Sequence, residues 1–322
     1  MAHGIGIIGL GVMGQRMLAS LGHHPGFAVV AAWDPSPDTL DRLRRDHPAI
    51  VAENSAQTLA ARADIAALYI ASPPVSHPAY VELAWDHGKA AFCEKPLAIS
   101  LAASERLVRR AAAERRRAAI NFPFASAPAA RAVAEAVAAG ALGTLERIDI
   151  AVAFAAWPRP WQRGGAWLAE RVEGGFVREV VSHFIFLTQR LAGPLAVGGA
   201  RLTYPADGKT AETAIEAHLT AGKIPIGLVG RVGEIAADDS NSLTVAGSKG
   251  ALRLYDWTGL QRREHGGWRE VDLGPGPPLR QRSAMTQLDQ LAALIEGHAH
   301  GLPTLQEGLA VQRCVEALLT GG

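Results

Sequence analysis

The hydrophobic and polar positions in the first half of the chain alternate in blocks. Apolar runs of strand length occur at 4–8, 27–33, 65–71, 90–93 and 117–121, with a weaker run at 49–52. Between them, amphipathic stretches with helical spacing lie at 12–22, 38–46, 55–62, 77–87 and 101–115. Strands that alternate with helices in this way predict an α/β domain built on a doubly wound parallel sheet.

The pattern changes after Asn121, where Pro123 and Pro128 flank a loop before the helical stretch 129–139. We place a domain boundary there, with a first domain at 1–121 and a second at 122–322. The following apolar runs have little helix between them and predict a largely antiparallel sheet, with runs near 145–155, 195–204, 212–220, 225–233, 242–247 and 250–255. Helical patterns that cover one face of that sheet, and so give an α+β domain, lie at 177–192, 285–297 and 305–319.

Composition narrows the class of protein. A chain of 322 residues, 48% hydrophobic and 20% charged, has the balance of a globular protein with two cores. A net charge of +1 and no basic stripe argue against nucleic acid as a partner, and no apolar run approaches the ~18 residues that span a membrane. Two cysteines, Cys93 and Cys314, are too few for a disulfide framework, and we predict no metal site. We expect a cytoplasmic protein.

A glycine motif follows the first predicted strand directly. Gly9-Leu-Gly11-Val12-Met13-Gly14 opens the helix at 12–22. In such a motif the first glycine permits a tight turn, the second lets the backbone approach a pyrophosphate, and the third allows the helix to pack on the strand. The N–H groups at the start of the helix then face the phosphates. This pattern predicts a Rossmann domain that binds a dinucleotide.

Asp34 stands at the end of the second predicted strand, roughly twenty residues beyond the motif. A carboxylate there accepts hydrogen bonds from the adenosine ribose hydroxyls and repels a 2′-phosphate, so it favours NAD over NADP as the cofactor. In the alternative interpretation, the glycines form a turn in an unrelated α/β protein and Asp34 is a helix cap or a surface residue.

Two further segments are more specific than the glycines. Ala71-Ser72-Pro73-Pro74-Val-Ser-His77 and Cys93-Glu94-Lys95-Pro96-Leu-Ala98, together with Gly174-Gly175 and Glu179-x-x-Ser182-His183, resemble the Gfo/Idh/MocA oxidoreductase family. The resemblance covers nearly the whole chain. It implies NAD(P)-dependent hydride transfer, a catalytic role for Lys95, and a cofactor site that includes Ser72, Pro73, His77, Glu94 and Lys95.

The position of Glu94 and Lys95 has a physical meaning of its own. Both fall at the carboxyl end of a predicted parallel strand, where open α/β sheets bind ligands. A lysine there can hold a substrate oxygen and assist proton movement, while Glu94 orients it or reaches the nicotinamide ribose. The alternative is a solvated ion pair. His77 either caps its helix or lines the nicotinamide side of the site.

The second-domain segment departs from the family pattern. Glu179 stands where the family has an aspartate, Val181 replaces a glycine and Phe186 replaces a second aspartate, whereas His183 is retained. On a helix, residues four apart share a face, so Glu179 and His183 can present a carboxylate and an imidazole together. We expect His183 to act as general acid or base, with Glu179 orienting it or binding a substrate hydroxyl. Alternatively, His183 packs in an apolar helix and Glu179 is solvated.

Aromatic residues are frequent in the loops that follow the domain boundary: Phe122, Phe124, Trp157, Trp161 and Trp167. They line a substrate pocket or close an interdomain core. We predict Phe122, Trp161 and Arg163 as substrate-contacting residues, with Arg159 as a further anchor. The proline-rich segment 274–283 is either a surface connection or a lid over an active site.

These features predict reversible hydride transfer between NAD(P) and a hydroxyl or carbonyl carbon of a small, sugar-like or cyclic polyol substrate. Two alternatives remain: a non-catalytic NAD(P)-dependent sensor or regulator on the same fold, and redox-neutral chemistry through transient oxidation. The resemblance implies that the second domain binds substrate and forms a homodimer or homotetramer. The identity of the substrate stays open.

Overall fold

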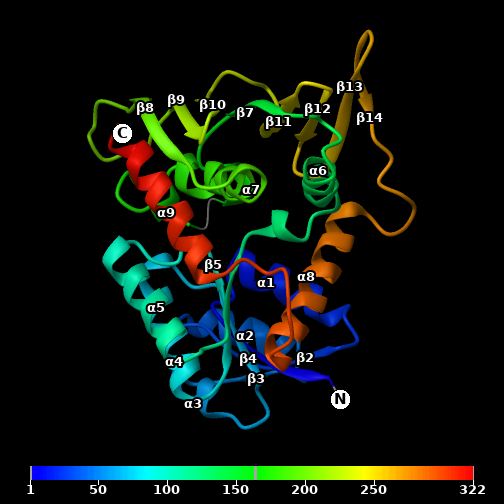
Figure 1. Cartoon of the computed structure of the whole chain (residues 1–322). Coiled ribbons are helices and arrows are strands. Elements are labelled where there is room, and N and C mark those ends of the chain that lie inside the picture. Colours follow the sequence, from blue (N-terminus) through cyan, green and yellow to red (C-terminus); the bar gives the residue numbers. More distant parts are fainter. Residues whose placement is uncertain (1, 163–164, 322) are drawn as a thin grey trace. The chain divides into compact units, whose positions relative to one another are not determined.

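The computed structural model of the protein describes residues 2–162 and 165–321. The chain forms two compact units, one of Met1–Pro123 with Ser283–Leu309 and one of Phe124–Arg282 with Ala310–Gly322 (Figure 1). The first unit thus contains a late segment that we had assigned to the second domain. Sequence order could not reveal this return, because the hydrophobic stripe of a helix does not say which sheet it covers.

A parallel sheet of six strands forms the first unit, as predicted. Its spatial order is β3-β2-β1-β4-β5-β6, which is the strand order of a Rossmann fold. The strands run over β1 His3–Ile8, β2 Phe27–Trp33, β3 Val51–Ala52, β4 Ala67–Ile70, β5 Ala90–Glu94 and β6 Ala118–Asn121. Because they are parallel, the carboxyl ends of β1, β4, β5 and β6 all reach the same edge of the sheet.

Helices cover both faces of this sheet (Figure 1). They are α1 Val12–Gly22, α2 Pro37–Asp46, α3 Ala56–Ala61, α4 His77–Asp86, α5 Leu101–Ala113 and, from the late segment, α8 Leu279–Glu296. Helices α1, α2 and α8 share one hydrophobic core with β1 and β5. The late helix contributes to this core through a stripe of buried residues at helical spacing, Leu288, Leu291, Leu294 and Ile295.

An eight-stranded sheet forms the second unit, in the order β14-β13-β12-β11-β7-β10-β9-β8. The pairs are antiparallel except for β7 with β10, which confirms the predicted α+β unit. The strands run over β7 Leu145–Phe154, β8 Ala196–Thr203, β9 Ala214–Ala221, β10 Ile224–Val232, β11 Asp239–Gly247, β12 Gly250–Tyr255, β13 Gly259–Glu264 and β14 Gly267–Glu270.

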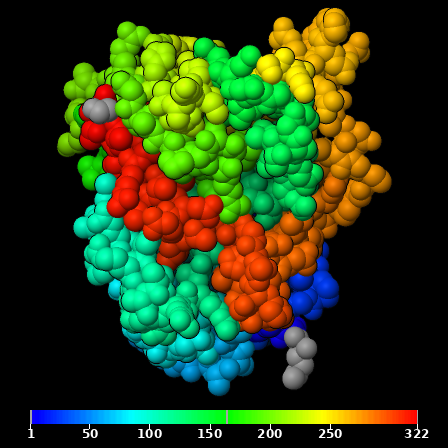
Figure 2. Space-filling model, in the orientation of Figure 1, coloured from blue at the N-terminus to red at the C-terminus, as the bar shows by residue number. Residues whose placement is uncertain are grey.

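The hairpin β13–β14 was not predicted. Half of the residues in its two strands are charged and half are exposed, so the hairpin carries no apolar run that would mark a strand. It stands out at the surface of the second unit (Figure 2).

The helices of the second unit are α6 Pro128–Ala138, α7 Ser182–Ala192 and the later part of α9 Leu305–Leu319. The helix predicted at 177–192 is present, with Val177–Val181 forming a π-helical turn directly before α7. Such turns are rare, often occur at functional sites, and leave no periodicity that a sequence would show. Within the described ranges, no helix has both the length and the apolar character needed to cross a membrane.

Candidate functional site

The glycine turn connects β1 to α1. Gly9 has a φ of +89°, and a Cβ there would lie 2.7 Å from the carbonyl oxygen of Ala71. A Cβ on Gly14 would lie 2.0 Å from the carbonyl oxygen of Gly9. Gly11 differs, because a Cβ on this N-cap residue of α1 would meet nothing within 4 Å. The protein itself therefore requires Gly9 and Gly14, whereas Gly11 leaves open space of the kind a pyrophosphate would fill at a helix N-terminus.

Asp34 follows β2 and ties it to this turn. One carboxylate oxygen, Oδ2, accepts a hydrogen bond from the backbone N–H of Leu10 at 2.8 Å, and Oδ1 accepts one from Ser36 at 2.9 Å. Asp34 therefore holds the backbone of the predicted cofactor site, a role that spacing alone did not suggest. Each carboxylate oxygen has a second lone pair, so these bonds leave capacity for a ribose hydroxyl.

The proline loop ends in His77, the first residue of α4. The ring of His77 is buried, with Nε2 at 2.8 Å from the carbonyl oxygen of Ser72 and Nδ1 at 2.7 Å from that of Pro96. His77 therefore connects the proline loop to the Glu94-Lys95-Pro96 segment. Ser72 lies on this loop, and its hydroxyl accepts a hydrogen bond from Ser76.

Glu94 and Lys95 lie at the carboxyl end of β5, as expected, and both are at least nine-tenths buried. Oε1 of Glu94 accepts hydrogen bonds from the Tyr69 hydroxyl and, at 2.7 Å, from the Asn121 amide. The amide oxygen of Asn121 in turn accepts a bond from Gln287 at 2.8 Å. Burial and the neighbouring charge of Glu94 raise the pKa of Tyr69, so the phenol keeps its proton and acts as a donor. This is not the environment of a solvated ion pair.

Glu179 and His183 lie in the second unit. Glu179 is on the π-helical turn Val177–Val181 and His183 is on the first turn of α7. Two aromatic rings meet the imidazole edge-on, Phe124 at 6.3 Å and Trp257 at 5.7 Å between ring centroids. Because π-helical geometry changes the angular offset between residues, the four-residue spacing does not by itself put Glu179 and His183 on one face.

Gly174 and Gly175 precede this turn and are explained by the backbone around them. A Cβ on Gly174 would lie 2.4 Å from the carbonyl oxygens of Trp167 and Leu168. Gly175 has a φ of +98° and lies against the carboxylate of Glu212, which accepts a hydrogen bond from the N–H of Val177. The glycines thus allow a buried carboxylate to cap the segment that carries Glu179 and His183.

The predicted substrate residues have different environments. Phe122 is buried, whereas Trp161 is 39% exposed and its ring lies 4.6 Å from the Arg159 guanidinium. Arg159 is itself buried in an ion pair with Asp239 at 2.7 Å, which makes it part of the structure of the second unit. Arg163 lies outside the residues that the structure describes.

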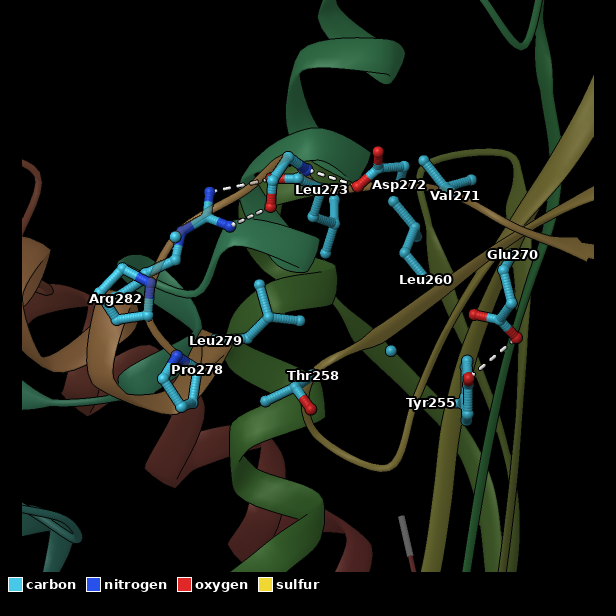
Figure 3. Close-up of a pocket in the computed structure, with 14 residues that line it drawn as sticks. Tyr255, Thr258, Leu260, Glu270, Val271, Asp272, Leu273, Pro278, Leu279 and Arg282 are labelled. Carbon is cyan, nitrogen blue, oxygen red and sulfur yellow. Dashed lines mark hydrogen bonds between the residues drawn. The ribbon is translucent and has the colours of Figure 1, made fainter.

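A cavity of about 400 Å³ lies within the second unit (Figure 3). Leu260, Leu273 and Leu279 contribute apolar side chains, and Tyr255 donates a hydrogen bond to Glu270 at its rim. The proline-rich segment forms one wall, where Arg282 donates hydrogen bonds to the carbonyl oxygens of Leu273 and Gly274. The segment therefore lines a cavity of its own unit.

The residues around these sites that were not predicted from the sequence include Tyr69, Asn121, Gln287, Trp257 and the capping residue Glu212. A hydroxyl within the apolar run 65–71 and an amide at the end of β6 were available signals, because both strands end at the ligand-binding edge. No comparable signal in the sequence marked Gln287 or Trp257 as part of a site. One comes from a late helix and the other from a turn between two strands.

Comparison with known proteins gives the wider context. Residues 3–122 match the family described as oxidoreductase family, NAD-binding Rossmann fold, Gfo/Idh/MocA. D-apiose dehydrogenase of Paraburkholderia graminis is 28% identical over 320 residues, which cover 94% of this chain and 80% of that protein. Inositol 2-dehydrogenase of Gluconacetobacter diazotrophicus is 35% identical over 119 residues, or 36% of this chain and 35% of that protein. Several other curated matches are similarly partial, and one spans only 24% of its relative.

The similarity in fold to solved structures covers both units. The crystal structure of an oxidoreductase domain protein from Kribbella flavida superposes with a TM-score of 0.85, at 21% identity, over 99% of this chain and 97% of that one. At this identity the likeness concerns the fold alone. Residues 3–122, which carry the glycine turn and the Glu94-Lys95-Pro96 segment, are thus similar to the NAD-binding Rossmann fold of the Gfo/Idh/MocA oxidoreductase family, and they span about a third of the length of the inositol 2-dehydrogenase.

Proposed function

We propose that the protein is an NAD-dependent dehydrogenase that transfers a hydride between nicotinamide and a hydroxyl or carbonyl carbon of a small polyol or sugar. The observation that carries this proposal is the buried Glu94–Lys95 pair at the edge of the sheet where the glycine turn also lies. Burying two ionisable side chains without a purpose is costly, so their presence at the ligand-binding edge supports a chemical role.

The residues of the first unit fit a dinucleotide. Gly11 and the N–H groups of Val12 and Met13 would hold the pyrophosphate, and Asp34 would accept hydrogen bonds from the ribose hydroxyls. The carboxylate of Asp34 favours NAD, because a 2′-phosphate would add negative charge beside it. Ser72 and Pro73 lie on the proline loop that His77 holds, and they would contact the nicotinamide half. When bound, the nicotinamide accepts or donates the hydride.

Lys95 handles the proton in this proposal. In the direction of carbonyl reduction its ammonium group would donate a proton to the substrate oxygen, and in the reverse direction its neutral amine would accept the hydroxyl proton as the alcohol becomes a carbonyl. Glu94 orients Lys95, and the bonds from Tyr69 and Asn121 keep the Glu94 carboxylate in one position. A fixed carboxylate lowers the reorganisation that the reaction would otherwise require.

His183 and Glu179 belong to the second unit, and we propose them as a general acid–base group and a group that binds a substrate hydroxyl. The aromatic rings beside His183 support a defined position for its imidazole. Polyols and sugars are the proposed substrates because relatives of the chain are named inositol 2-dehydrogenase and D-apiose dehydrogenase.

The test combines cofactor binding with turnover. NADH and NADPH are titrated by fluorescence, and tighter binding of NADH is the expected result. Inositols and aldoses, D-apiose included, are then screened by following NADH formation. Replacing Lys95 by Ala should lower kcat/KM by roughly 10²- to 10⁴-fold, the usual contribution of acid–base groups. Lys89→Ala is the matched control, because Lys89 precedes β5 whereas Lys95 follows it. The ammonium of Lys89 donates a hydrogen bond to the Arg62 carbonyl oxygen at 2.7 Å, away from the proposed site.

Two outcomes would overturn the proposal. Failure of both dinucleotides to bind at millimolar concentration would remove the cofactor role. Binding without turnover of any compound, with Lys95→Ala unaltered in its response to ligands, would instead support the non-catalytic sensor.

A further inference from the structure

The turn between β12 and β13 has an unusual backbone. Tyr255 pairs with Gly259, and the residues between them include Asp256 at a φ of 43° and Trp257 at a φ of 69°. Glycine and asparagine are the residues that adopt this left-handed region readily, and a bulky side chain in it is strained. The sequence thus places a tryptophan where the backbone favours a glycine.

Two hydrogen bonds hold this conformation. The buried Asn241 of β11 accepts a bond from the N–H of Asp256 on its carbonyl oxygen at 3.0 Å. Its side-chain oxygen Oδ1 accepts a second from the N–H of Trp257 at 3.1 Å. Strained residues persist where the surrounding structure determines them in this way, and they cluster at functional sites.

The indole of Trp257 contacts residues of the predicted acid–base site. It stacks on Phe124 at 5.7 Å, with 27° between the ring planes, and meets the His183 ring at 5.7 Å and 82°. Phe124 meets the same imidazole at 6.3 Å and 83°. These distances and angles are those of favourable aromatic pairs. The imidazole is therefore flanked by two aromatic rings that also contact each other.

We infer that Trp257 is a positioning residue that sets the orientation of the His183 imidazole, and that the strained turn exists to present its indole there. This inference rests on the proposed function only in giving His183 a catalytic role. A glycine at position 257 would relieve the backbone strain of the turn but would remove the indole ring. Backbone stability alone therefore does not account for a tryptophan at this position. Tyr255 and Thr258 flank the strained pair and line the cavity of Figure 3, whereas Trp257 is not among the lining residues.

The experiment compares three variants, Trp257→Gly, Trp257→Phe and Asp256→Gly. The primary readout needs no substrate: it is the rate at which diethyl pyrocarbonate modifies His183, followed by peptide mass spectrometry. We expect Trp257→Gly to raise this rate about 10-fold, because one flanking ring is removed. Trp257→Phe keeps a ring and should stay within about twofold of the natural protein. Asp256→Gly relaxes the same turn without touching the ring and is the matched control.

The second readout is kinetic and uses whichever polyol or sugar is oxidised. Trp257→Gly should lower kcat roughly 10- to 100-fold and leave KM for NAD unchanged, since misplacement of a catalytic group costs rate. Thermal unfolding of each variant checks that it is folded. If Trp257→Gly is unfolded, Trp257→Leu takes its place with the same expected rise in His183 modification.

The inference is overturned if loss of the ring leaves His183 modification within about twofold, or if Asp256→Gly changes it equally. These results are independent of the proposed function. If neither dinucleotide binds while loss of the Trp257 ring uncovers His183, the proposed function fails and the positioning of His183 stands. If Lys95→Ala is inactive and His183 is unaltered, only the present inference fails.

Discussion

Nδ1 of His77 lies 2.7 Å from the carbonyl oxygen of Pro96, and this bond joins two loops at the ligand-binding edge of the first sheet. The other ring nitrogen, Nε2, lies 2.8 Å from the carbonyl oxygen of Ser72. The residue before Pro96 is Lys95, so the position of the proposed catalytic lysine depends on a histidine eighteen residues earlier in the chain.

We therefore predict that His77→Ala destabilises the protein and impairs turnover. Loss of hydrogen bonds by buried carbonyls costs about 1–3 kcal/mol each, which a urea unfolding curve will detect. We expect kcat to fall more than the affinity for NADH, because the lysine loop loses its anchor. His87→Ala serves as the control, since His87 is exposed at the end of the same helix and should change stability by less than about 0.5 kcal/mol. Equal effects of the two substitutions would contradict the proposed role of His77.

The glycine turn supplies a matched pair of substitutions. Gly11→Ala places a methyl group in open space and should leave the melting temperature unchanged, yet lower dinucleotide affinity at least about 10-fold. Gly14→Ala places the methyl 2.0 Å from a carbonyl oxygen and should destabilise the unit itself. Fluorescence titration with NADH and thermal unfolding separate the two effects. Unchanged NADH binding by Gly11→Ala would show that the pyrophosphate lies elsewhere.

Tyr69→Phe removes one of the donors to Glu94. A hydrogen bond to a charged group contributes about 1.5–3 kcal/mol, so we expect a loss of stability in that range and a lower kcat. Tyr80→Phe is the control, because Tyr80 is only half-buried and packs edge-on against Trp33. The two variants are compared by urea unfolding and by initial rates. A Tyr69→Phe protein as stable and active as Tyr80→Phe would rule out a structural or positioning role for the hydroxyl.

Glu212 makes a pH-dependent contribution to stability. Burial raises the pKa of this carboxyl above its ordinary value of 4.5, and the bond from the Val177 N–H opposes the rise only in part. The folded state then holds the proton more tightly than the unfolded state, so stability falls as pH rises from about 4.5 through the folded pKa. We expect Glu212→Gln to gain stability relative to the natural protein across that interval.

Glu216 gives a control of opposite sign. Hydrogen bonds from Arg231 and Arg201 lower the pKa of this carboxyl, so its contribution is present above 4.5 and lost as pH falls through the lowered pKa. Glu216→Gln should therefore lose relative stability as pH rises. Urea unfolding at a series of pH values measures both variants. If the free energy of unfolding of Glu212→Gln changes with pH in parallel with that of the natural protein, the Glu212 carboxyl is not the source of the pH dependence.

Both cysteines should be inert in the folded protein. Burial raises the pKa of Cys93 well above its ordinary value and raises that of Cys314 to about 12, so neither forms the reactive thiolate near neutral pH. We expect slow reaction with an aromatic disulfide reagent in buffer and rapid reaction of both thiols in denaturant. A thiol that reacts rapidly in the native protein would show that the structure around that cysteine opens to solvent.

Much of the first unit was readable in the sequence because its determinants are local. A strand, a Gly9-x-Gly11-x-x-Gly14 turn and a helix lie in one continuous segment, and Asp34 follows at the spacing that one βαβ unit imposes. Glu94 and Lys95 could be placed at the ligand-binding edge for the same reason, since the carboxyl ends of parallel strands coincide. Each inference required only the neighbours of a residue along the chain.

The glycine turn, Asp34, the Glu94–Lys95 pair and the two kinds of sheet were thus determined by the sequence alone. Only the tertiary structure decided that Gln287 completes the hydrogen bonds around Glu94, that α8 returns to the first sheet, and that Trp257 flanks His183. The physical reason is distance along the chain. These contacts join residues separated by scores of positions, and periodicity, capping and turn signals describe only residues that are close in sequence.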